Sequence, residues 1–264
     1  SNNFSLDPVR ASSQRHRVES QTAAQWGRTM GRYRYNRAFA IALMGAGPAV
    51  SELRSNMSNK DTIDGEITCD VAIIGGGPAG STTAALVRKY APSVSVLVLE
   101  KEKFPRDHVG ESHLPSIGAI INEMGCWDEV ENADFPLKVG ATYRWGKSQE
   151  LWDFDFAPPA EVEKVQRPTP YEGVRHFTAF QVDRAIYDDI LLRHAEKLGA
   201  EVREETLVAE VLKDGDTVTG LKLSTGETVR AKYYVDASGH VGTLRRAMGV
   251  ETHPETSLQN VAFW

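Results

Sequence analysis

The amino-acid sequence predicts an α/β fold built on a parallel β-sheet. Three observations support this prediction. A short apolar run, residues 71–74, is followed at once by the glycine pattern of residues 75–80 and by a helical segment. A second apolar strand follows that helix and ends at an acid, Glu100. A third apolar strand, residues 233–239, returns far later in the chain and ends in small residues. Short apolar runs bounded by glycine are typical of parallel strands that are buried on both faces.

The turn after the first strand carries the residue types that a phosphate-binding turn needs. In Gly75-x-Gly77-x-x-Gly80, the first glycine permits a tight turn and the second lets the backbone approach a pyrophosphate. The third allows the following helix to lie close to the strand. Pro78 stands in the first helical turn, where its missing N–H costs nothing. The helix over residues 81–90 then presents its free N–H groups and its positive dipole end to the phosphates.

Glu100 ends the second strand, residues 95–100, and lies 20 residues after Gly80. A carboxylate at this place can accept both hydroxyls of an adenosine ribose, whereas it would repel a phosphorylated ribose. The pattern therefore predicts a dinucleotide, but it does not separate NAD from FAD. The strand over residues 233–239, with a β-rich insertion before it, favours FAD. Classical NAD domains continue instead through alternating strands and helices.

Composition excludes several classes of function. The net charge is −6, and the positive charge is concentrated in residues 1–60. An acidic body binds polyanions poorly, so we expect no nucleic-acid partner. No uncharged stretch, residues 38–50 and 71–87 included, reaches the ~20 residues of a bilayer span. Cys69 and Cys126 lack any metal-site or redox-pair spacing, which indicates reduced thiols in a cytoplasmic protein.

Residues 1–60 differ in composition from the rest of the chain. They are rich in Arg and Ser, and Met57 resembles a natural start. Three origins stay open: translated upstream sequence, the end of a preceding domain, or a targeting segment. We divide the chain into this extension, with little ordered packing beyond one helix around residues 29–43, and a domain over residues 61–264.

Longer motifs resemble those of the flavin-dependent halogenases, which share the fold of the FAD-dependent aromatic hydroxylases. The resemblance runs from about residue 70 to residue 264. The motifs that carry it are residues 75–80, Phe-Pro-Arg and Gly-Glu-Ser within residues 104–112, and residues 135–146, 180–184 and 235–239. It implies a glutathione-reductase-like FAD-binding Rossmann domain with part of an inserted mixed β-sheet substrate region.

The resemblance also assigns residues to FAD. It implies that Arg106 contacts the ribose or pyrophosphate and that the backbone near Val208 meets the adenine. It places Gly110 and Ser112 near the flavin, at the start of a helix over residues 111–124. For Arg106, a solvated loop cation is the alternative. The residues expected to bind FAD are Gly75, Gly77, Pro78, Ala79, Gly80, Glu100, Arg106, Gly110, Ser112, Gln181, Arg184, Val208, Asp236 and Gly239.

Lys138 is the candidate catalytic residue. It begins a predicted strand, residues 138–145. In the resembling family, a lysine at the matching place lies between the flavin pocket and the substrate pocket. There it would hold the halogen, by a hydrogen bond or covalently, and deliver it to one carbon. A lysine in an apolar site can have a lowered pKa, which favours the amine. The alternative is an ordinary solvated lysine at a strand edge.

Aromatic residues crowd the next segment. In residues 151–156 they alternate with acids, so one strand face is aromatic. That face is either packed in a sheet or the wall of an aromatic-substrate pocket. The proline-rich loop of residues 157–171 is a candidate cover for such a pocket. Asp183 is expected to cap a helix over residues 184–198. Further strands are predicted over residues 177–182, 201–211, 218–223 and 228–235.

The resemblance implies halogenation of an electron-rich aromatic such as a phenol or pyrrole, free or tethered to a carrier protein. Chloride or bromide would be the co-substrate, and a separate flavin reductase would supply reduced FAD. The alternatives are a flavin monooxygenase, a geranylgeranyl-reductase-like oxidoreductase, and a flavin-binding module without turnover. In the resembling family the chain continues with a Trp-x-Trp-x-Ile-Pro segment. We therefore expect that residues 1–264 alone do not halogenate.

Overall fold

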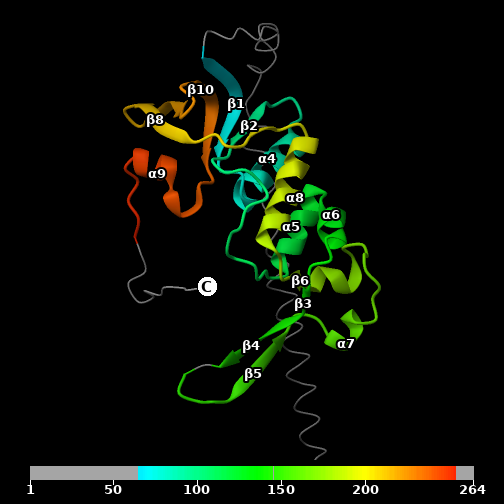
Figure 1. Ribbon diagram of the computed structural model, residues 1–264. Coiled ribbons are helices and arrows are strands. Elements are labelled where there is room, and N and C mark those ends of the chain that lie inside the picture. Colours follow the sequence, from blue (N-terminus) through cyan, green and yellow to red (C-terminus); the bar gives the residue numbers. More distant parts are fainter. Residues whose placement is uncertain (1–64, 145, 254–264) are drawn as a thin grey trace, which may run out of the picture. The chain divides into compact units, whose positions relative to one another are not determined.

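The computed structural model describes residues 65–144 and 146–253 (Figure 1). These belong to one compact unit that extends from Asp61 to Trp264. The predictions for residues 1–60, including their helix, lie outside the described residues.

The elements are distributed between one large sheet, two small sheets and a set of helices. The strands are β1 (Glu66–Ile74), β2 (Val96–Leu99), β3 (Leu137–Lys138), β4 (Gly140–Arg144), β5 (Leu151–Asp155), β6 (Ala179–Phe180), β7 (Glu201–Arg203), β8 (Val208–Asp214), β9 (Thr217–Leu223) and β10 (Thr228–Asp236). The helices are α4 (Pro78–Tyr90), α5 (Ser116–Met124), α6 (Trp127–Asn132), α7 (Pro159–Val162), α8 (Arg184–Lys197) and α9 (Thr243–Ala247), with 3₁₀ turns η2 (Gly173–Phe177) and η3 (Gly239–Val241).

The large sheet has six strands in the order β7-β2-β1-β10-β9-β8. The first four run parallel, whereas β9 and β8 continue the sheet in antiparallel pairs. Strand β10 lies beside β1 from Thr228, opposite Glu66, to Asp236, opposite Ile74. The predicted return of the late strand and the α/β fold class are confirmed. The carboxyl ends of β1, β2 and β10 meet at one edge, which is where parallel sheets bind ligands.

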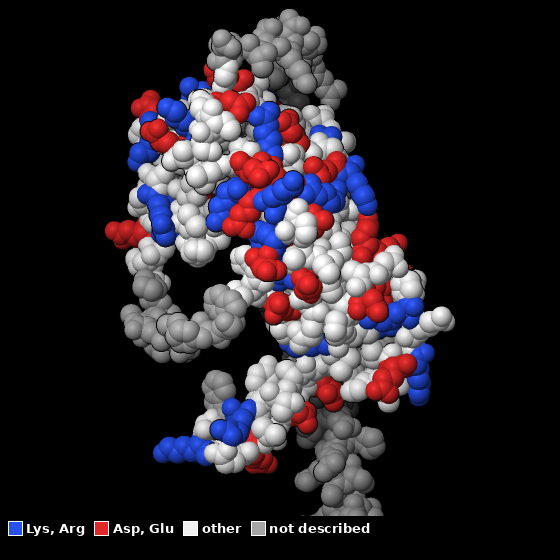
Figure 2. Space-filling model, viewed as in Figure 1, with Lys and Arg blue, Asp and Glu red and all other residues white. Residues whose placement is uncertain are grey.

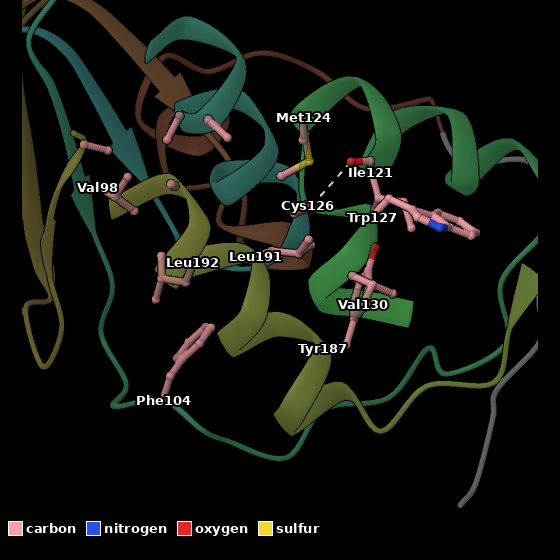
Figure 3. Close-up of a cluster of buried hydrophobic side chains, with 14 of the residues drawn as sticks. Val98, Phe104, Ile121, Met124, Cys126, Trp127, Val130, Tyr187, Leu191 and Leu192 are labelled. Atoms are coloured by element: carbon pink, nitrogen blue, oxygen red, sulfur yellow. Dashed lines mark hydrogen bonds between the residues drawn. The ribbon is translucent and has the colours of Figure 1, made fainter. Parts of the chain in front are cut away.

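Strands β1 and β2 are buried on both faces, as their unbroken apolar runs predict. Val71 and Ile73 face helices α4, α5, α6 and α8, where Tyr187 and Leu191 belong to the same cluster (Figure 3). Ala72, Ile74 and their neighbours in β2 pack instead with side chains of β8, β9 and β10. Each fully buried aliphatic side chain of this kind stabilises the fold by about 2 kcal/mol. Because the two clusters pack on opposite faces of the sheet, they hold in place the carboxyl ends of β1 and β2, where the candidate site lies.

The single strand predicted over residues 201–211 is wrong. Strand β7 pairs with β2 at one edge of the sheet, whereas β8 pairs with β9 at the other. The chain must therefore leave the sheet between them, and it does so at Glu205, which has a φ of 53°. The strand-forming residues on either side of this break do not reveal such a change of partner.

The strand predicted over residues 138–145 is also divided. Strand β3 pairs with β6, and Lys138 lies opposite Ala179. After Val139, strand β4 pairs with β5 in a separate hairpin. The backbone N–H of Phe156 donates to the carbonyl of Val139 at the point of division. Likewise β6 is shorter than the strand predicted over residues 177–182, because the 3₁₀ turn η2 precedes it.

The helix predicted over residues 111–124 starts later, at Ser116. The preceding residues are extended: His113 N–H donates to the carbonyl of Phe180 (3.1 Å), and Val182 N–H donates to that of Glu111 (2.8 Å). By contrast, the cap of α8 is confirmed, because the Asp183 carboxylate accepts the Ala185 N–H at 2.8 Å.

The aromatic face of the β4–β5 hairpin is exposed within the described residues. Tyr143 and Trp152 stack at 5.0 Å between ring centroids, yet Trp152 remains 50% exposed. The far end of the loop over residues 157–171 contacts α6. Trp127 donates to the carbonyl of Thr169 (3.0 Å), and its ring meets that of Tyr171 edge-on.

Positive and negative side chains are interspersed over the described face shown in Figure 2. Within residues 65–144 and 146–253, no helix has both the length and the apolarity that a bilayer crossing requires. Both cysteines are free thiols. Burial, followed by nearby carboxylates, raises the pKa of Cys69 and of Cys126 to about 12, so neither thiol is activated at neutral pH.

Candidate functional site

The turn between β1 and α4 is closed by two glycines that no other residue could replace. Gly75 has a φ of 105°, and a Cβ there would lie 2.4 Å from the carbonyl oxygen of Ala237. A Cβ at Gly80 would lie 1.8 Å from the carbonyl oxygen of Gly75. At Gly77, a Cβ would meet only Nη2 of Arg106, at 3.4 Å. The turn is therefore packed against β10 on one side and leaves room in front of Gly77.

Helix α4 begins at Pro78, and Ala79 and Gly80 complete its first turn. No side chain caps this end, and the first turn contains no acidic residue. The first N–H groups of a helix have no partner within it, and they carry the positive end of the helix dipole. The end of α4 that faces Gly77 is therefore suited to a phosphate group.

Glu100 lies at the end of β2 and is 4% exposed. Its Oε2 accepts the N–H of Gly76 (2.6 Å), and its Oε1 accepts that of Glu102 (2.9 Å). The carbonyl of Glu100 accepts the Thr206 N–H at 2.7 Å, two residues before Val208 begins β8. The structure thus brings Glu100 and Val208 to one edge. Each carboxylate oxygen keeps lone-pair capacity for a ribose hydroxyl.

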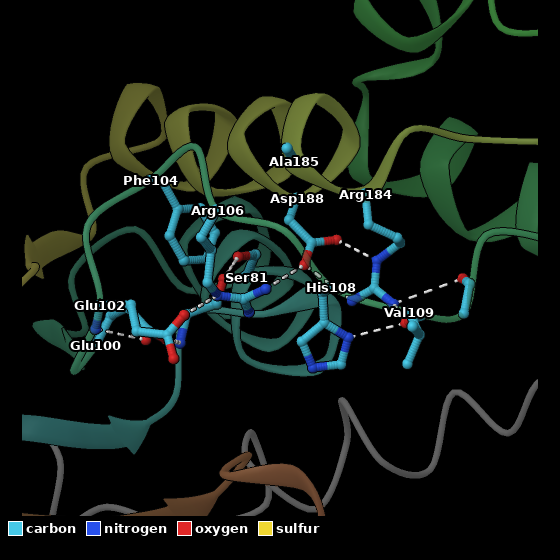
Figure 4. A network of polar contacts seen from close by, with 12 residues as sticks. Ser81, Glu100, Glu102, Phe104, Arg106, His108, Val109, Arg184, Ala185 and Asp188 are labelled. Atoms are coloured by element: carbon cyan, nitrogen blue, oxygen red, sulfur yellow. Dashed lines mark hydrogen bonds and ion pairs between the residues drawn. The ribbon is translucent and has the colours of Figure 1, made fainter. Parts of the chain in front are cut away.

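Arg106 and Arg184 are both predicted site residues, and both contact Asp188, which the sequence analysis did not single out. Asp188 is fully buried and binds Nε and Nη2 of Arg184 at 2.7 and 2.8 Å (Figure 4). Its Oδ2 also accepts Nη1 of Arg106 at 3.3 Å. Arg184 reaches the carbonyls of Val109 and Gly110 with its Nη1. Neither arginine is a solvated cation, so that alternative for Arg106 is wrong.

Asp236 and Gly239 follow at the end of β10. Oδ1 of Asp236 accepts the N–H and hydroxyl of Ser238, and Oδ2 accepts the N–H groups of Leu244 and Arg245. Burial acts to raise the pKa of Asp236, but these hydrogen bonds outweigh it and leave the pKa below its usual value. The carboxylate therefore holds the turn around Gly239, which has a φ of 64°.

Ser112, Gln181 and Lys138 share one face of a small three-stranded arrangement. Ser112 pairs with Gln181 in an antiparallel bridge, and Gln181 N–H donates to the carbonyl of Pro136 (2.8 Å). Because side chains alternate along a strand, Lys138, opposite Ala179, lies on the same face as Gln181. Nζ of Lys138 crosses this face and donates to the hydroxyl of Ser112 at 2.9 Å.

Two further side chains lie near this face: Phe156, from the aromatic segment over residues 151–156, and His113, which follows Ser112. The ring of Phe156 lies 5.7 Å from Nζ of Lys138. The ring of His113 meets that of Tyr187 at 4.8 Å between centroids, and its buried Nδ1 has no partner among the described residues. Burial, followed by the charge of Arg184, lowers the pKa of His113.

These features fit an FAD molecule. The uncapped end of α4, the room in front of Gly77 and the nearby guanidinium of Arg106 suit a pyrophosphate. Glu100 suits the adenosine ribose. The network through Asp188 and Arg184 connects this edge with Gly110 and the face that carries Lys138. Within the described part of the chain, no group of three or more His, Cys, Asp and Glu side chains could hold a metal ion.

A sequence model of the tryptophan halogenase family matches residues 70–171 and 160–258. The 1H-pyrrole-2-carbonyl-[peptidyl-carrier protein] chlorinase of Pseudomonas fluorescens is 41% identical over 192 residues, which are 69% of this chain and 41% of that protein. Tryptophan 2-halogenase of Chondromyces crocatus is 34% identical over 199 residues, which are 74% and 34% of the two chains.

Solved structures agree with these sequence matches. The myxobacterial chondrochloren halogenase, described as a variant of the FAD-dependent halogenases, matches this chain with a TM-score of 0.55 and 40% identity. The match covers 65% of this chain and 37% of the halogenase chain. The flavin-dependent halogenase CmlS has a TM-score of 0.57 and 38% identity, with coverage of 70% and 32%. This chain spans about two fifths or less of the first two curated relatives.

Proposed function

Because the chain belongs to the tryptophan halogenase family, we propose that the complete protein is a flavin-dependent halogenase of electron-rich aromatic compounds. We favour a pyrrole or phenol that is tethered to a carrier protein. The support for tethering is that two relatives, a chlorinase and a brominase, are named for 1H-pyrrole-2-carbonyl groups on a peptidyl-carrier protein. Chloride or bromide is the co-substrate.

FAD would bind at the edge formed by β1, β2 and β10. The first turn of α4 and Arg106 would hold the pyrophosphate, and Glu100 would hold the adenosine ribose. Gly110, Ser112 and Gln181 would lie nearer the flavin ring. Bound reduced FAD would activate dioxygen, which is the oxidant that converts halide into an electrophilic halogen. A separate flavin reductase would supply the reduced FAD, which places the proposed enzyme in the cytoplasm.

The observation that carries this proposal is the position of Lys138. Its Nζ is held over a polar face by Ser112, and the ring of Phe156 lies beside it. An amine placed here can hold the halogen in one of two ways. It can donate a hydrogen bond to hypohalous acid, or its nitrogen can form a bond to the halogen while the halogen–oxygen bond breaks and water leaves with the amine proton. It would then present the halogen to one carbon of the aromatic ring, whereas free hypohalous acid would react indiscriminately.

The test is an assay of the complete protein with a flavin reductase, FAD, dioxygen, and pyrrole-2-carbonyl carrier protein or a panel of phenols. We expect a halogenated product by mass spectrometry when chloride or bromide is present, and none in halide-free buffer. A hydroxylated product that forms without halide would indicate a monooxygenase instead. Bound FAD without any product would indicate a flavin-binding module.

A further inference from the structure

The carboxylate of Asp188 is fully buried, although carboxylates are rarely buried without a specific role. It lies one turn after Arg184 on α8, so both side chains project from the same face of the helix. Nε and Nη2 of Arg184 grip both carboxylate oxygens in a two-point contact (Figure 4). This contact is the strong, directional kind of charge-assisted hydrogen bond.

The same carboxylate determines how Arg106 is turned. Nη1 of Arg106 donates to Oδ2 of Asp188, and Nε faces the Glu102 carboxylate, each at 3.3 Å. The remaining nitrogen, Nη2, is the one that faces Gly77. Because a guanidinium is planar and rigid, fixing two of its nitrogens fixes the direction of the third. Glu102 is 44% exposed on its side chain, so Asp188 is the firmer of the two anchors.

We propose that Asp188 is a positioning residue for FAD binding that acts through Arg106. This inference rests on the proposed function, because it takes FAD as the ligand of the turn. Asp188 holds Nη2 of Arg106 toward the place of the pyrophosphate. It makes no contact with the cofactor.

The proposal predicts that FAD binds more weakly when the Asp188 carboxylate is removed. A simple count of charges predicts tighter binding, so the two explanations can be told apart by experiment. Removing a carboxylate near a phosphate strengthens phosphate binding if only long-range electrostatics matter. If Asp188 positions Arg106, its removal weakens binding instead. The variant Asp188→Asn keeps the size of the side chain and removes its charge. In the complete protein, we expect the FAD dissociation constant, measured by quenching of flavin fluorescence, to rise roughly tenfold, as for one lost charge-assisted contact.

The effect must also depend on Arg106. In an Arg106→Ala background, Asp188→Asn should change the FAD dissociation constant less than about twofold, because its means of action is gone. Asp189→Asn is the matched control, because Asp189 is the next residue on α8 and pairs with Arg193 on the solvent side. It should leave FAD binding unchanged. Tighter or unchanged binding by Asp188→Asn, or effects that add fully with Arg106→Ala, would overturn the inference.

A second variant keeps the test decisive if Asp188→Asn fails to fold. Arg106→Lys retains the positive charge on a partly exposed loop. A lysine ammonium, however, cannot donate to Asp188 with one nitrogen while a second nitrogen faces Gly77, as the planar guanidinium does. It should lose most of the affinity that Arg106→Ala loses, and wild-type affinity would overturn the inference. If the wild-type protein itself binds no FAD, the proposed function fails together with this inference. If the wild type binds and only these variants disagree, the inference alone fails.

Discussion

Lys138 is fixed at both its backbone and its side chain. Its backbone pairs with Ala179 across β3 and β6, and its Nζ reaches Ser112 on the far side of that strand. A long, flexible side chain held at two points loses rotamer freedom on folding rather than on binding a reactant. This hydrogen bond gives the amine of Lys138 a direction, and the catalytic role of Lys138 stays a prediction.

For this single residue, we predict that Lys138→Ala abolishes halogenation and leaves FAD binding intact. Halogenated product should fall by about a hundredfold or more, the usual loss when a reacting group is removed. The FAD dissociation constant should stay within about twofold, because Lys138 lies away from the Gly77 turn. Product is measured by mass spectrometry and FAD binding by fluorescence titration on the same preparation.

The control for this prediction is Lys147→Ala, which removes an exposed lysine from the turn of the β4–β5 hairpin. It should leave both product and FAD binding unchanged. Near wild-type halogenation by Lys138→Ala would remove Lys138 from the mechanism.

Elements whose partners are neighbours in sequence were the easiest to predict. The run from β1 through α4 to β2 and the cap of α8 at Asp183 follow from local patterns. The breaks at Val139 and Glu205 do not, because each marks a strand that changes partner. Pairing between strands is decided by segments far apart in the chain, which a period of two residues does not encode.

The first turn of helix α9 is capped by Asp236, and this cap contributes to the stability of the fold. Both N–H groups that Asp236 accepts through Oδ2 belong to the first turn of this helix. Asp236→Ala should lower the free energy of unfolding by about 1 kcal/mol at neutral pH, the usual worth of a capping side chain at an exposed site. Denaturant unfolding of the complete protein measures it.

The pH dependence follows from the lowered pKa of Asp236. A carboxylate with a lowered pKa stabilises the fold above its unfolded-state pKa, and this contribution disappears as the pH falls through the folded-state pKa. The stabilities of wild type and Asp236→Ala should therefore converge in acid. Asp216 lies in an exposed turn, so the free energy of unfolding of Asp216→Ala should equal that of the wild type at both neutral and acid pH. A constant gap between wild type and Asp236→Ala at both pH values would contradict this account.

In the described unit, the predicted site residues fall into two groups. One lies at the carboxyl edge of the large sheet, and the other lies on the face that carries Lys138 and Ser112. The arginine network around Asp188 lies between them. Glycines and the strand-ending Glu100 could be predicted because they act through local backbone geometry. Asp188 could not, because its role depends on Arg106, which belongs to another element.

The central claim is that the turn at Gly77 binds FAD, and a titration of the complete protein with FAD and with NAD tests it most directly. The account predicts that the flavin absorbance spectrum shifts on binding and that NAD does not bind. Gly77→Val should abolish FAD binding, because its side chain would fill the room before α4, while Thr82→Val on the same helix should bind as the wild type does. Binding of NAD without flavin, or undiminished FAD binding by Gly77→Val, would contradict the account.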